Sequence, residues 1–261
     1  MRCRDVEWAA FLYNAIGEDK SYIMHLHRVK CGMKDAQTID DKVAEEIVTF
    51  LNEWRSRAYR KGVKPTIREW YSEVKDKLDT LHQSLIEADF EDGSISESIR
   101  EIYGKLVEKA YVGDTIASKI LHILKPDLFV AWDIAIKEWY RSVLSDGGKG
   151  VDSDELYLRF LRKMQEEASS LIEENGNFLD ELNSKVIRLW RGDQEQTKKV
   201  GTEPSDPDEG KEEKISSYGE ISELMERNGG KTMAKYLDEY NWITITNKVK
   251  IPPEWHPDWE D

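Results

Sequence analysis

Residues 113–136 hold the side chains of this chain that are best placed for chemistry. Because Asp is a strong N-cap residue, we take Asp114 as the cap of a helix that runs to residue 125 and rotate each residue by 100°. Thr115, Lys119 and His122 then share one face, and the apolar residues of the helix cover the opposite face. The spacing therefore predicts a polar face that carries an amine and an imidazole.

A second helix is expected just beyond the first. Pro126 ends the first helix, and Asp133 lies at the N-terminus of the next one. An amine, an imidazole and a carboxylate should therefore meet at one helix-to-helix corner. Lys119 can act there as a nucleophile, and Asp133 can stabilise positive charge or assist proton transfer. A structural interpretation stays open, since Asp133 is a favourable helix cap and Lys119 can be a solvated helix lysine.

The sequence around this corner resembles the helix-hairpin-helix DNA glycosylase superfamily, the base-excision enzymes that include 8-oxoguanine and adenine glycosylases. In that superfamily a Val-Gly-x-x-x-Ala hairpin leads into a helix. A Pro-Asp-x-Phe-x-Val-Asp-like segment then delivers an essential aspartate at the start of the following helix. The matching parts of this chain are Val112-Gly113-Asp114-Thr115-Ile116-Ala117, then Pro126-Asp127-Leu128-Phe129 and Asp133.

The resemblance implies an all-α fold and a flipped-out nucleotide that enters the corner. Lys119 would attack the sugar C1′, and Asp133 would assist. The Schiff-base lysine of the bifunctional members aligns with Thr115, and Lys119 follows one helical turn later on the same face. Gly113, Thr115 and His122 are the expected nucleic-acid contacts of this stretch.

A second candidate surface comes from the segment 54–77, which holds eight basic side chains against three acidic ones. The whole chain has a net charge of −14, but residues 201–261 carry 15 acidic and only 7 basic side chains. A local basic face is therefore compatible with the overall charge, and it can neutralise phosphates while interleaved aromatic rings stack on bases. The same residues can also be ordinary solvated and core positions. The cations that we assign to nucleic-acid binding are Arg55, Arg57, Arg60 and Lys61.

Composition limits the other function classes. The chain has 261 residues, 39% of them hydrophobic, without an apolar run of membrane-span length or a signal-peptide core, so we expect a cytoplasmic protein. His25, His27 and Cys31 lie close in sequence but lack a convincing fourth ligand, so we expect no metal site. We also expect no cofactor.

Helical periodicity runs through the chain to residue 191, so we predict an all-α, multi-helix globular domain for residues 1–191. Residues 192–214 are rich in charge, Gly and Pro and read as a flexible acidic linker. Residues 215–261 are predicted to form a small, mainly helical C-terminal unit that docks on the main domain or on another protein. The alternation in residues 242–246 predicts one short strand in it.

Two functional hypotheses follow. The first is a nucleic-acid-binding, DNA glycosylase-like protein that excises a base or cleaves at an abasic site through Lys119 and Asp133. The alternative is a non-catalytic, all-α interaction module whose acidic C-terminal segment binds a protein partner. The position of the Lys119 amine and the Asp133 carboxylate separates them, because only the first hypothesis needs both groups in one cleft.

Overall fold

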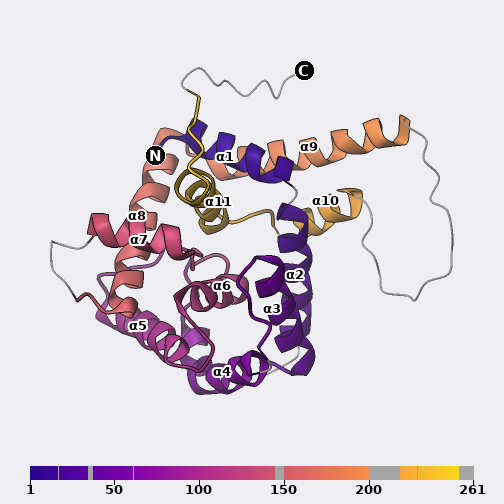
Figure 1. The fold of residues 1–261 in the computed structure, drawn as a ribbon. Coiled ribbons are helices and arrows are strands. Elements are labelled where there is room, and N and C mark those ends of the chain that lie inside the picture. The colour runs from indigo at the N-terminus through magenta and orange to yellow at the C-terminus, as the bar shows by residue number, and fades with distance from the viewer. Residues whose placement is uncertain are drawn as a thin grey trace, which may run out of the picture.

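The computed structural model describes residues 1–16, 18–34, 38–60, 62–144, 150–199, 218–227 and 229–252. Over these residues the chain is built from α-helices and one π-helical turn, without a β-strand, which confirms the all-α prediction (Figure 1). None of the helices in the described part of the chain combines the length and apolar character that a membrane span requires.

The helices follow one another with short connections. Their bounds are α1 (Cys3–Ile16), α2 (Glu18–Met33), α3 (Asp41–Glu53), α4 (Val63–Thr80), α5 (Gly93–Val107), α6 (Asp114–Leu124), α7 (Ile134–Leu144), α8 (Ser153–Glu174), α9 (Phe178–Lys199), α10 (Tyr218–Arg227), α11 (Met233–Asn241) and the π-helical turn η1 (Trp242–Thr246).

Helix α6 occupies the middle of the fold, where it packs against α2, α3 and α5 (Figure 1). Its apolar side is completely buried at Ala117, Ile120 and Leu121. Burial of about 25 cal/mol per Å² of apolar surface holds such a helix in place more firmly than its intrinsic propensity does. The predicted apolar arc therefore fixes α6 in the core and leaves its polar face to look elsewhere.

The C-terminal helices share the core of the rest of the chain. Leu224 and Met225 of α10 and Met233 and Leu237 of α11 belong to the same buried apolar cluster as the helices before them. Helix α11 packs against α1 and α8. The expected docking of this segment on the main domain therefore takes the form of shared apolar packing.

The short strand predicted for Trp242–Thr246 is wrong, because these residues form the π-helical turn η1 that continues α11. The Thr244 hydroxyl donates to the Tyr240 carbonyl at 2.7 Å, and the Asn247 amide donates to the Trp242 carbonyl at 3.0 Å. A lone strand would leave its backbone groups without partners, whereas a wide helical turn satisfies them locally. Period-two alternation over five residues was too short to distinguish the two.

The predicted linker begins later than expected, since α9 continues past residue 191 to Lys199. The rest of the predicted linker, residues 200–214, lies outside the described residues.

Candidate functional site

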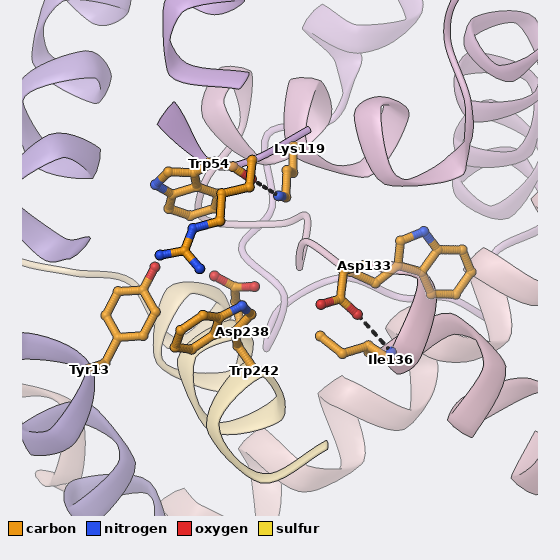
Figure 2. A pocket seen from close by; sticks show the side chains of 9 residues that line it. Tyr13, Trp54, Lys119, Asp133, Ile136, Asp238 and Trp242 are labelled. Carbon is orange, nitrogen blue, oxygen red and sulfur yellow. Dashed lines mark hydrogen bonds between the residues drawn. The ribbon is translucent and has the colours of Figure 1, made fainter. Parts of the chain in front are cut away.

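A pocket opens where six segments of the chain meet, and it encloses about 420 Å³ of empty space, including its mouth (Figure 2). The segments are α1, the end of α3, α6, the approach to α7, α11 and η1. Its lining residues are Tyr13, Trp54, Arg55, Lys119, Trp132, Asp133, Ile136, Asp238 and Trp242. Both residues predicted to be catalytic therefore lie in one pocket, and one predicted nucleic-acid contact, Arg55, lines it with them.

Lys119 reaches the pocket from the polar face of α6. Its Nζ donates a hydrogen bond to the main-chain carbonyl of Trp54 at 2.6 Å and lies 5.5 Å from the centroid of the Trp54 ring (Figure 2). The carbonyl and the electron-rich ring face both attract an ammonium group. The end of α3 thus sets the position of the Lys119 side chain.

Asp133 precedes α7 and caps it. Its Oδ1 accepts a hydrogen bond from the Ile136 amide at 2.9 Å, and its Oδ2 accepts one from the Thr246 hydroxyl at 2.7 Å. The first bond is the N-cap interaction expected from sequence, and the second ties the carboxylate to η1. Asp133 stays partly exposed, so capping and chemistry are compatible roles for it.

Asp114 does not cap α6, because Gly113 occupies the N-cap position without a side-chain hydrogen bond. Asp114 instead receives hydrogen bonds from the Tyr103 hydroxyl at 2.9 Å and the Lys137 amine at 2.6 Å. Burial opposes the charge of this carboxyl, but bonds from Lys137, Ser153 and Tyr103 outweigh it and lower the pKa of Asp114. This aspartate therefore joins helices rather than serving the pocket.

His122 was predicted to contact nucleic acid, and its position does not allow this, because its side chain is completely buried. Its Nδ1 bonds the Phe129 carbonyl at 2.6 Å, and its ring stacks near Tyr22 and Trp54. Burial lowers the pKa of His122 to about 4. His122 therefore supports Trp54 from behind as a neutral ring.

The other predicted nucleic-acid contacts lie on or near the α5–α6 and α3–α4 connections. Gly113 is exposed at the start of α6, and Thr115 is partly exposed in its first turn. Arg57 and Arg60 are exposed. Lys61 lies outside the described residues.

The connection after α3 has an unusual backbone. Arg55 and Arg57 adopt φ values of 57° and 54°, in the left-handed region that costs energy for residues other than glycine. Between and beyond them, the Tyr59 side chain is 74% exposed, and the Arg60 guanidinium lies 5.6 Å from the ring centroid of Tyr111 on the α5–α6 connection. Two arginines in strained conformations and an exposed ring beside a pocket are typical of a functional loop.

Sequence reasoning missed the pocket residues that come from the ends of the chain, Tyr13, Asp238 and Trp242. Asp238 and Trp242 are four residues apart, the spacing that places two side chains on one helix face. That spacing was readable, but the pocket that they face is built by residues more than 100 positions away. Trp132 could have been found, because it directly precedes Asp133.

Among the described residues, no group of three His, Cys, Asp or Glu side chains is arranged to hold a metal ion. Comparison of the chain with protein-family models, with curated proteins and with solved structures finds no match.

Proposed function

We propose that this chain is a nucleic-acid-binding, DNA glycosylase-like protein that excises a base or cleaves at an abasic site through Lys119 and Asp133. The observation that carries the proposal is that these two residues, chosen from sequence, line one pocket together with Arg55. The amine comes from α6 and the carboxylate from the start of α7, as the superfamily resemblance requires. Aromatic rings of Tyr13 and Trp54 add flat surfaces on which a base can stack.

The chemistry follows from these groups. The lone pair of a neutral Lys119 amine forms a bond to C1′ of a flipped-out nucleotide while the bond from C1′ to the base breaks. The base leaves with that electron pair and takes up a proton, and the nitrogen of the new bond loses one. Asp133, held by the Ile136 amide and the Thr246 hydroxyl, stabilises the positive charge that develops on the sugar.

The surface around the pocket fits a nucleic-acid backbone. Arg57 and Arg60 are exposed beside Arg55, and cations at such positions neutralise phosphates. The N-terminus of α6 begins at Gly113 without a side-chain cap, so its backbone amides and helix dipole add a site suited to one phosphate. Exposed Tyr59 supplies a ring for stacking on a base.

Borohydride trapping tests the proposal. An abasic sugar in its open aldehyde form condenses with the Lys119 amine to an imine and water, and hydride from borohydride reduces the imine to a stable secondary amine. We expect the full chain to form a covalent adduct with a duplex that carries one abasic site, and Lys119→Ala to form none.

Lys125→Ala is the matched control, because Lys125 also ends α6 and also donates to a main-chain carbonyl, that of Leu81 at 3.3 Å, yet does not line the pocket. It should trap like the unchanged chain. Equal loss in both variants, or an undiminished adduct in Lys119→Ala, would remove Lys119 from the reaction.

A base-release assay on duplexes with oxidised or mispaired bases distinguishes an excising enzyme from a lyase that acts on abasic sites alone. A chain that neither traps, releases a base nor binds any of these duplexes would contradict the proposal and leave the interaction-module alternative.

A further inference from the structure

Behind the pocket wall lies a group of charged side chains that are sealed from water. This buried ion cluster consists of Asp19, Lys231, Lys235, Asp238 and Glu239. The side chains of both lysines and of Glu239 are 0% exposed. Such charges are tolerated only because each lysine has carboxylate partners.

Lys235 is the member of the buried ion cluster that touches the pocket. Its Nζ lies 4.2 Å from the ring centroid of Tyr13, 4.8 Å from that of Tyr22 and 4.6 Å from that of Trp54. It also pairs with the Asp238 carboxylate at 3.1 Å. Three of these four partners, Tyr13, Trp54 and Asp238, line the pocket.

The same contacts lead on to the proposed nucleophile. Trp54 receives Lys235 at its ring and Lys119 at its main-chain carbonyl, so one residue bridges the two amines. A cation held over an aromatic face gains about 0.5–2 kcal/mol and resists displacement of the ring. Any shift of Trp54 would therefore move the hydrogen-bond acceptor of Lys119.

We propose that Lys235 is a positioning residue of the pocket, which fixes Tyr13, Trp54 and Asp238 from behind and, through Trp54, sets the place of the Lys119 amine. The proposal deepens the proposed function and rests on it for the reaction that the pocket performs. The placement of Lys119 is itself measurable without that reaction.

Lys231 provides the matched contrast. It is equally buried, and it pairs with Asp19 at 2.7 Å and with Glu239 at 2.9 Å. Its ring partner is Tyr236, at 4.8 Å, which does not line the pocket. Glu239 pairs with both lysines, Lys235 at 3.2 Å, so one carboxylate can be neutralised together with either amine.

The test compares two double variants of the full chain, Lys235→Met with Glu239→Gln and Lys231→Met with Glu239→Gln. Each removes one buried cation and the same buried carboxylate, which avoids leaving an unpaired charge in the core. Circular dichroism and thermal unfolding establish that both fold before they are compared.

The first readout is the carbon-13 NMR signal of Lys119 after reductive methylation with labelled formaldehyde, assigned by its absence in Lys119→Arg. This signal senses the Trp54 ring beside it and needs no DNA. We expect it to shift or broaden in the Lys235 pair and to keep its position in the Lys231 pair.

The second readout is the rate of borohydride trapping on an abasic duplex. We expect at least about a tenfold loss in the Lys235 pair, because an ångström-scale misplacement of a reacting group can cost about a hundredfold. The Lys231 pair should stay close to the unchanged chain. Equal behaviour of the two pairs in the NMR measurement would overturn the role of Lys235, whereas absence of trapping in the unchanged chain would count against the proposed function alone.

Discussion

The pocket and the buried ion cluster place charged side chains on two sides of the same tryptophan, with opposite exposure to solvent. In the pocket, Lys119 and Asp133 are partly exposed and bond to a backbone carbonyl, a backbone amide and a hydroxyl. In the cluster, Lys231 and Glu239 are fully buried and bond each other. Charges that bond each other hold helices together, and charges bonded to neutral groups keep their charge for a ligand.

The cluster also shows how burial changes a carboxyl group. Burial and the neighbouring Asp19 raise the pKa of Glu239 to about 8, although Lys231 and Lys235 act in the opposite direction. The cluster is therefore sensitive to its exact number of charges, and the pocket beside it inherits that sensitivity through Asp238.

Breaking the cluster should have the largest effect on stability. Lys231→Met alone leaves Asp19 and Glu239 without their cation, so we expect it to lower the free energy of unfolding by about 3–5 kcal/mol. Adding Glu239→Gln should restore part of that loss. Urea unfolding monitored by circular dichroism measures both. A single variant as stable as the unchanged chain would show that the cluster does not depend on paired charge.

Acid should destabilise the fold through His122. Because the folded pKa is lowered to about 4, the unfolded state takes up the proton first as pH falls below the ordinary value of about 6.5. Between those values roughly 3 kcal/mol of stability should be lost, with little further loss from this group below pH 4. His122→Phe should remove this part of the pH dependence in denaturant titrations at each pH.

His25 should act with the opposite sign. Burial alone would lower its pKa, but hydrogen bonds with Glu46 and Glu53 raise it above the ordinary value. Its contribution to stability is complete below the unfolded pKa and is lost as pH rises through the folded one. A His25→Phe chain that lost the same acid-side dependence as His122→Phe would contradict this assignment.

Within the pocket, Asp133→Asn separates capping from chemistry. Asparagine is as good an N-cap as aspartate, so the free energy of unfolding should change by less than about 1 kcal/mol. The rate of base release or trapping should fall by about a hundredfold, because the negative charge that faces the sugar is gone. Parallel losses of stability and rate would assign Asp133 to the cap alone.

The smallest effect should come from the surface beside the pocket. Arg57→Ala should weaken duplex binding for all sequences and reduce the slope of log affinity against log salt by about 1, the signature of one phosphate contact. Arg68→Ala is the control, since Arg68 belongs to the same basic segment but already pairs with Asp41 at 2.6 Å. Fluorescence anisotropy at several salt concentrations measures both slopes.

The local parts of this molecule were predictable from sequence. The apolar arc of α6, the stop after it and the start of α7 at Asp133 follow from periodicity and capping, and these features bring Lys119 and Asp133 to one corner. Helical periodicity likewise predicted the all-α fold, which the structure confirms.

The remaining parts of the site depend on which helix covers which face. A helical wheel groups His122 with Lys119, but it does not reveal that Tyr22 of α2 packs over the imidazole and buries it. Nor does it reveal that α11 brings Asp238 to α6 across more than 100 residues. These contacts are decided by packing between distant elements, on which local pattern is silent.

The bond from Thr246 to Asp133 joins residues 113 positions apart in the chain. During synthesis, at roughly 5–20 residues per second, α6 and α7 leave the ribosome seconds before η1 exists. Until then Asp133 has its cap but not its second partner, and the pocket lacks the walls formed by Asp238 and Trp242. The order of translation thus keeps the amine and the carboxylate from forming a finished site on a nascent chain.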